Sequence, residues 1–364
     1  MAPRFRITAG LTLGLAAVCA AAQPAAAQDP YGTATVVARG LDNPRGLNFG
    51  PDGALFIAEA GRSSTNCFRL SGDAFCAGGT GAIARLEGRS LTRVAQGLVS
   101  FGDRTGAFAS GPPDVHVARS GRIYTVLPSL GEQPTQRLRR GLRRQLGKLL
   151  RVRNRFTATI AGLDRIEFAS NPDRRGVESN PHGLAVLGPD TQYVVDAGGN
   201  TLLEVTAGVV SVEAVFPNAA PRAESVPTSV RVGPDGALYV GELTGDRAPN
   251  GRARVWRIVP GQPPTVFATG FTRISGLAFG PDGSLFVAEL SRNLRRLDPR
   301  GRVVRVAPGG ARTVLGEGKL SFPGGVAVGP DGAVYVSNWS VAPGRPASRG
   351  PLRGRTGQIV RLGP

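Results

Sequence analysis

The stretch Asn43-Pro-Arg-Gly-Leu-Asn-Phe-Gly-Pro-Asp-Gly-Ala-Leu-Phe-Ile-Ala-Glu59 decides the fold, because five further copies follow it in this chain of 364 residues. Clear copies begin at Pro227, Ile274 and Pro323, and weaker ones begin at Pro112 and Pro181. Each clear copy alternates apolar residues on both sides of Gly-Pro-Asp-Gly, which is the pattern of two strands joined by a tight turn. A unit repeated six times predicts a closed or stacked repeat architecture.

Two more alternating segments follow the paired strands of each repeat. They cover residues 82–86 and 91–95 in the first repeat, and 254–259 and 265–268 in the fourth. Four antiparallel strands in a unit of roughly 45–50 residues are typical of a propeller blade. We therefore predict an all-β fold, a six-bladed β-propeller with four antiparallel strands per blade, and a solenoid is the alternative.

The last repeat supplies only three strands, at residues 325–328, 333–337 and 358–362. Residues 33–38, which precede the first repeat, have the pattern of the missing fourth strand. We expect this N-terminal strand to complete the last blade, which would close the ring and leave no exposed sheet edge between the first and last repeats.

The N-terminus has the features of a secretory signal. Arg4 and Arg6 precede an apolar segment at residues 11–22, and three alanines end at Ala27. We predict a cleaved signal peptide over residues 1–27, a single propeller domain over residues 28–364, and a secreted or periplasmic location. No later apolar run is long enough to span a membrane. Because export exposes thiols to an oxidising compartment, we expect a disulfide between Cys67 and Cys76.

The formal net charge is +18, and almost all of the basic residues are arginine. No nucleic-acid-binding motif accompanies this charge, so we interpret it as a solvated surface and do not expect a nucleic-acid partner. Residues 136–150 carry leucines at helical spacing with arginines between them, which predicts a short basic amphipathic helix. The basic segment 137–155 would either contact an anionic membrane or polymer, or pack on its own domain.

The expected insertions all fall on one face of the ring, opposite the short Gly-Pro-Asp-Gly turns. We call it the loop-rich face, and ligand sites of rigid β scaffolds usually lie on such a face. Residues expected there end each second strand or precede each first strand. The candidates for ligand contact are Arg45, Glu59, His182, Asp196, Asn200, Glu242, Glu289, Asn338 and Trp339, and Thr228, Ser275 and Gly324 occupy equivalent positions. His116 is expected in an innermost strand that lines the channel.

The carboxylates of this set have three interpretations. A divalent cation, calcium or zinc, would be held by Glu59, Asp196 and Asn200, because hard cations prefer oxygen ligands. Two carboxylates could instead form an acid–base pair. In the third interpretation, each accepts hydrogen bonds from loop groups of its own blade, which explains why the position repeats. No nucleophile elbow, phosphate-binding loop or zinc-ligand spacing is present, so no catalytic residue is assigned.

Several segments together resemble the ScyD/ScyE family, named for proteins linked to scytonemin biosynthesis. They include Ser110-Gly-Pro-Pro-Asp-Val115, Glu178-Ser-Asn-Pro-His-Gly-Leu184, Val195-Asp-Ala-Gly-Gly-Asn-Thr-Leu-Leu203 and Gly236-Ala-Leu-Tyr-Val-Gly-Glu-Leu-Thr-Gly245. The resemblance implies an exported, NHL-type six-bladed propeller. More distantly, the scaffold is similar to sugar lactonases that use a Glu, an Asn and an Asp with calcium or zinc, residue types that Glu59, Asn200 and Asp196 supply.

Three hypotheses of function follow. The first is an exported propeller that binds a small molecule, a polymer or an extracytoplasmic partner on the loop-rich face. The second is a metal-dependent hydrolase or sugar-lactonase-like enzyme that uses the carboxylates there. The third is an accessory enzyme in the biosynthesis of a secreted, scytonemin-like aromatic metabolite. The sequence leaves open whether the protein is an enzyme.

Overall fold

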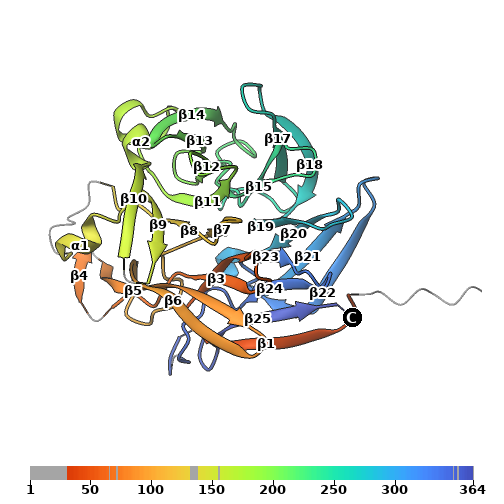
Figure 1. Cartoon of the computed structure of the whole chain (residues 1–364), viewed down its shortest axis with the longest axis horizontal. Helices are drawn as coiled ribbons and strands as arrows, with labels where there is room; N and C mark the ends of the chain where they lie inside the picture. Colours follow the sequence, from red (N-terminus) through yellow and green to blue (C-terminus); the bar gives the residue numbers. More distant parts are fainter. Residues whose placement is uncertain are drawn as a thin grey trace, which may run out of the picture.

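The structure is a computed structural model that describes residues 31–64, 66–70, 73–131, 138–154, 156–346, 348–350 and 352–363. The predicted signal peptide at residues 1–27 lies outside them. The described chain forms six antiparallel sheets arranged as blades around an axis (Figure 1). This confirms the predicted six-bladed propeller.

Each blade is built on four strands, which follow one another along the chain in blades 1 to 5, whereas blade 6 has three consecutive strands and takes β1 as its fourth. Blade 1 holds β2 (Pro44–Phe49), β3 (Leu55–Glu59), β5 (Asp73–Glu87) and β6 (Ser90–Gly102), with β4 (Cys67–Leu70) on the far end of β5. Blade 2 holds β7 (Val115–Val117), β8 (Ile123–Val126), β9 (Lys148–Arg153) and β10 (Phe156–Gly162). Blade 3 holds β11 (Pro181–Val186), β12 (Thr191–Asp196), β13 (Thr201–Thr206) and β14 (Val209–Val215).

The second half of the ring continues the pattern. Blade 4 holds β15 (Pro227–Val232), β16 (Leu238–Glu242), β17 (Ala253–Ile258) and β18 (Thr265–Phe271). Blade 5 holds β19 (Ile274–Phe279), β20 (Leu285–Glu289), β21 (Arg300–Val306) and β22 (Arg312–Ser321). Blade 6 holds β23 (Val326–Val328), β24 (Val334–Asn338), β25 (Gly357–Leu362) and β1 (Ala34–Leu41). The short helices are α1 (Arg140–Arg143), α2 (Asp164–Ser170) and η2 (Leu294–Arg296).

Strand β1 closes the ring as predicted. It pairs antiparallel with β25, from Ala34 opposite Leu362 to Leu41 opposite Gly357. The apolar core is divided among the seams between neighbouring blades, and the seam between blades 6 and 1 packs Leu47 and Ile57 against Ile359. Because every blade buries both of its faces against neighbours, the ring needs this last seam as much as the others.

The Gly-Pro-Asp-Gly turns owe their shape to backbone and side-chain bonds that recur. In blade 1, Gly53 has a φ of +77°, a conformation that favours glycine. One carboxylate oxygen of Asp52 accepts the amide of Ala54, and the other accepts Arg85 of the third strand at 2.8 Å. The equivalent ion pairs in blades 4, 5 and 6 are Arg257–Asp235, Arg305–Asp282 and Arg361–Asp331.

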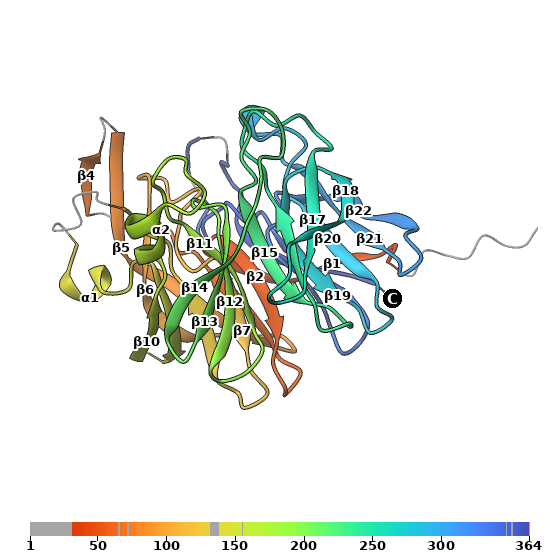
Figure 2. The ribbon, with the colours of Figure 1, turned by 90° about the horizontal axis from the view of Figure 1, so that it is seen from above.

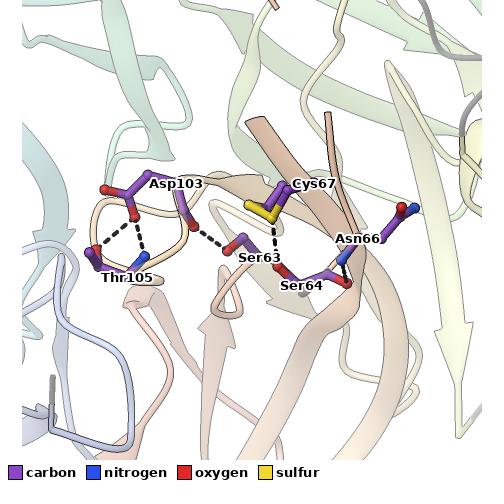
Figure 3. The surroundings of a disulfide bond; sticks show 7 residues. Ser63, Ser64, Asn66, Cys67, Asp103 and Thr105 are labelled. Atoms are coloured by element: carbon purple, nitrogen blue, oxygen red, sulfur yellow. Dashed lines mark hydrogen bonds between the residues drawn. A yellow bond between two sulfur atoms is a disulfide. The ribbon is translucent and has the colours of Figure 1, made fainter. Parts of the chain in front are cut away.

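The two faces of the ring differ as expected. In Figure 2 the short turns lie at the lower edge, whereas β4 and the adjoining end of β5 project from the upper edge. Cys67 and Cys76 form the predicted disulfide between these two strands. Beside it, Ser63 donates to the carbonyl of Asp103, whose carboxylate accepts two hydrogen bonds from Thr105 (Figure 3).

The predicted amphipathic helix at residues 136–150 is wrong for most of its length. Only the four residues of α1 are helical, Gly147 has a φ of +62°, and residues 132–137 lie outside the described part. Leu149 and Leu150 belong instead to β9, where they are buried on opposite faces of blade 2. Pairing within the blade outweighs the helical spacing of the leucines. Among the described residues, none of the helices has the length and apolarity to span a membrane.

Candidate functional site

The residues at the start of the innermost strands meet at the loop-rich end of the central channel. One comes from each blade, and together they line a cavity of about 60 Å³ that we call the channel mouth. These six are Arg45, Pro113, His182, Thr228, Ser275 and Gly324. Leu243 and Leu290 add apolar surface. The structure therefore brings together Arg45 and His182, two of the candidates named from the sequence.

Arg45 is the charged group of the channel mouth. Its Nη2 donates to the carbonyl of Ala109 at 3.0 Å, and it forms no ion pair with any described residue. Burial lowers the pKa of the Arg45 guanidinium to about 10, so it remains a cation at neutral pH. A guanidinium carries five N–H donors, and most of those on Arg45 have no partner in the described protein.

His182 stands beside this cation as a neutral imidazole. Burial lowers the pKa of His182 to about 4, and the positive charge of Arg45 acts in the same direction. Its Nδ1 lies 2.8 Å from the carbonyl of Thr228. Because a carbonyl only accepts, Nδ1 carries the proton and Nε2 is left as an acceptor. The channel mouth thus offers an anion-binding group next to a hydrogen-bond acceptor.

Deeper in the channel, Asp114 and Arg231 form an ion pair that sequence reasoning missed. The two nitrogen–oxygen distances are 2.8 and 3.1 Å, and Asp114 also accepts the amide of Leu184 at 3.0 Å. His116 lies close by, and burial and the charge of Arg231 lower the pKa of His116 to about 4. A signal was available, because at the repeat position of Asp114 the other copies have only glycine or serine.

The side chains that end the second strands accept hydrogen bonds from groups of their own blades or of the loops that lead into them. Each accepts a hydrogen bond from a residue 16 or 17 positions earlier. The donors are the amide of Asp42 for Glu59, of Asn180 for Asp196, of Thr272 for Glu289 and of Ser321 for Asn338, and the hydroxyl of Ser225 for Glu242. Arginines then neutralise three of them, in the pairs Arg93–Glu59, Arg254–Glu242 and Arg302–Glu289.

These contacts match the interpretation in which each carboxylate serves its own blade. Glu242 shows the pattern most fully, because it accepts hydrogen bonds from Arg254, from Ser225 and from the indole of Trp256. Trp339 packs on Phe322 and beneath the guanidinium of Arg355, whose carbon lies 4.8 Å from the ring centre. Neither Glu242 nor Trp339 lines the channel mouth.

The residues proposed for a divalent cation do not fit one. Both oxygens of Glu59 accept from Arg93, and Asp196 accepts three backbone amides on one oxygen and Ser179 on the other. The amide oxygen of Asn200 accepts the N–H of Val226. Within the described ranges, no group of three or more His, Cys, Asp or Glu side chains is arranged to hold a metal ion.

Comparison with known proteins places the fold but no family. No protein-family model matches the chain, and no curated protein sequence matches it. Among solved structures, a glucose dehydrogenase is 18% identical over 91% of this chain and 99% of its own, with a TM-score of 0.53. A putative gluconolactonase is 12% identical, covering 90% of this chain and 91% of its own, also at 0.53. The calcium-binding protein regucalcin from Agrobacterium tumefaciens is 14% identical, covering 90% and 92%, again at 0.53. These likenesses concern the six-bladed fold alone.

Proposed function

We propose that this protein is an exported propeller that binds the carboxylate head of a small organic acid in the channel mouth. The observation that carries the proposal is Arg45, a half-buried cation that lines a cavity and has no carboxylate partner among the described residues. Removing a charge even partly from water is costly, and a counter-ion in the cavity would offset that cost. A carboxylate matches the fork of a guanidinium with two parallel hydrogen bonds.

His182 narrows the class of acid. Its Nε2 accepts a hydrogen bond, so it suits a ligand that carries a hydroxyl group next to the carboxylate. Pro113, Leu243 and Leu290 form apolar walls. The cavity of about 60 Å³ holds only a head group, and the rest of the ligand would extend toward the surrounding loops. A hydroxycarboxylic acid is therefore the ligand class that we propose.

Two further parts of the proposal rest on the sequence. Export is supported by the signal-like residues 1–27 and by the disulfide between Cys67 and Cys76. Membership of the ScyD/ScyE group is supported by the segments quoted above. A hydrolase that uses the strand-end carboxylates has less support, because Glu59, Asp196 and Glu242 already hold protein donors.

Calorimetric titration with a panel of small acids tests the channel mouth. The panel contains glycolate and gluconate, which carry a hydroxyl next to the carboxylate, acetate and 4-hydroxybenzoate, which do not, and glucose as the uncharged probe. We expect at least one hydroxy acid to bind and to raise the melting temperature, since a ligand that binds only the folded state stabilises it. Arg45→Gln should abolish the effect, and Arg45→Lys should weaken it because the fork is lost.

Arg247→Gln is the matched control, because Arg247 is an exposed arginine in the loop that follows β16 of blade 4. It should bind the acids as the unaltered protein does. Circular dichroism of each variant separates lost binding from lost folding. Equal binding by folded Arg45→Gln, or no binding of any acid by the unaltered protein, would refute the proposal.

A further inference from the structure

The face of the short turns carries a charge pattern that is broken in one blade. In blades 1, 4, 5 and 6, the turn aspartate pairs with an arginine of the third strand, at distances of 2.7 to 2.9 Å. The arginine always stands opposite an aromatic residue of the second strand, as Arg85 does with Phe56. The pair neutralises each of these blades at its turn.

Blade 2 keeps the arginine and loses the aspartate. Arg151 stands opposite Tyr124, the register of the other four arginines. The turn has the same backbone bonds, from Ala118 to Arg122 and from Gly121 to Ala118, as Gly50–Ala54 has in blade 1. Ser120 therefore occupies the place of Asp52, and Arg122 the place of Ala54. Neither Arg122 nor Arg151 has an ion pair or a side-chain hydrogen bond within the described chain.

The two arginines line a cavity of about 620 Å³ between blades 1 and 2. Arg153 and the ring of Phe156, which is 78% exposed, complete its polar and apolar sides. None of its described lining residues is acidic. Two backbone bonds hold its edge, because the amide of Asn154 donates to the carbonyl of Val94 and that of Gln96 to the carbonyl of Asn154.

One acidic residue lies in an adjoining cavity. Asp190, from the turn of blade 3, lines that cavity together with Arg122 and Arg151. It is exposed and forms no ion pair with either arginine in the structure as described. The residue at the arginine position of the third strand is Glu204 in this blade, so blade 3 lacks the usual ion pair at its turn.

We propose that the cavity between blades 1 and 2 binds a sulfate or phosphate monoester that carries an aromatic group. Arg122, Arg151 and Arg153 supply forked donors for the oxyanion, and Phe156 supplies a face for the ring. The site lies on the face opposite the channel mouth and is independent of it. Within the basic segment 137–155, which was expected to contact an anionic surface, the proposed site uses Arg151 and Arg153 of strand β9.

Restoring the repeat is the sharpest test. Ser120→Asp combined with Arg122→Ala recreates the turn chemistry of the other blades and gives Arg151 its missing partner. Arg89→Glu is the control, since it alters the net charge by the same two units at an exposed arginine on the same face, in the β5–β6 turn. Titrations at low salt use 4-nitrophenyl sulfate, 4-nitrophenyl phosphate, inorganic sulfate and inorganic phosphate as probes.

We expect the aromatic esters to bind more tightly than the inorganic ions, and the repaired variant to lose about tenfold or more in affinity. Phe156→Ala should weaken the esters but not the ions, and the two esters together show whether sulfate or phosphate is preferred. The control should bind as the unaltered protein does. Unchanged binding by the repaired variant, an equal loss in the control, or no binding of any probe would overturn the proposal.

Discussion

Asp114 and Arg231 lie 117 residues apart in the chain, yet they form a two-point ion pair across the channel, with nitrogen–oxygen distances of 2.8 and 3.1 Å. The side chain of Asp114 is 5% exposed and that of Arg231 is 17% exposed. Because Asp114 also accepts the amide of Leu184, this one carboxylate joins blades 2, 3 and 4. A methyl group on Gly46 of blade 1 would overlap the Asp114 carboxylate, so the backbone of a fourth blade also packs against this side chain.

Asp114→Asn should therefore destabilise the ring strongly. It leaves the partly buried Arg231 without its counter-ion, and breaking a buried pair in this way costs about 3–5 kcal/mol. Denaturant unfolding measures the loss. The matched variant is Asp235→Asn, which breaks an ion pair with both side chains more than a third exposed and should cost no more than about 1 kcal/mol. Similar losses in the two variants would contradict the proposed role of Asp114.

Glu242→Gln distinguishes a structural carboxylate from a ligand-binding one. The buried Glu242 side chain accepts from Ser225, Arg254 and Trp256, so the substitution should lower the free energy of unfolding by about 3 kcal/mol or more. The affinity of the folded fraction for a carboxylate at Arg45 should not change. Denaturant unfolding and calorimetry on the same sample check both statements. A loss of affinity without a loss of stability would restore Glu242 as a ligand residue.

The repeat made most of the fold predictable from the sequence. The Gly-Pro-Asp-Gly turns located the paired strands, and the unmatched strand at residues 33–38 predicted the ring closure that β1 makes with β25. The same alignment placed Arg45 and His182 at one end of the channel, where the structure has them. Local patterns were sufficient because each blade repeats the same local solution.

Contacts between distant blades could not be predicted from the sequence. Asp114 meets Arg231 only because the ring brings strands β7 and β15 to the same channel, and no spacing in the chain encodes that contact. The helical spacing of the leucines in residues 136–150 gave a wrong prediction, since Leu149 and Leu150 pack on the two faces of a strand. Asp114 and residues 136–150 both lie where the second repeat departs from the other copies. Ser120 and Arg122 are departures of the same repeat on the opposite face.

His182 should make the protein less stable in acid. Its pKa is lowered from 6.5 to about 4 in the folded protein, so between these values the unfolded chain binds a proton that the folded chain does not. Stability therefore falls as the pH drops from 6.5 toward 4, by up to roughly 3 kcal/mol. His182→Gln should remove this part of the pH dependence in denaturant unfolding from pH 4 to 7. Parallel curves for the variant and the unaltered protein would show that His182 does not titrate as described.

Glu167 should behave in the opposite sense. The residue is 3% exposed, its Oε1 has no hydrogen-bond partner in the described protein, and burial together with Asp173 and Asp196 raises its pKa to about 7. Between pH 4.5 and 7 the folded chain holds a proton that the unfolded chain releases, so this group costs stability as the pH rises through that window. Glu167→Gln keeps the shape of the neutral acid and removes the charge.

We expect Glu167→Gln to raise the free energy of unfolding at pH 8 by up to about 3 kcal/mol, and to leave it nearly unchanged at pH 4. Glu178→Gln, at an exposed carboxylate in the loop that follows α2, should have little effect at either pH. Urea titrations at the two pH values measure the difference. A variant that is less stable than the unaltered protein at pH 8 would mean that the Glu167 carboxylate is ionised and held by a favourable contact, against the pKa described here.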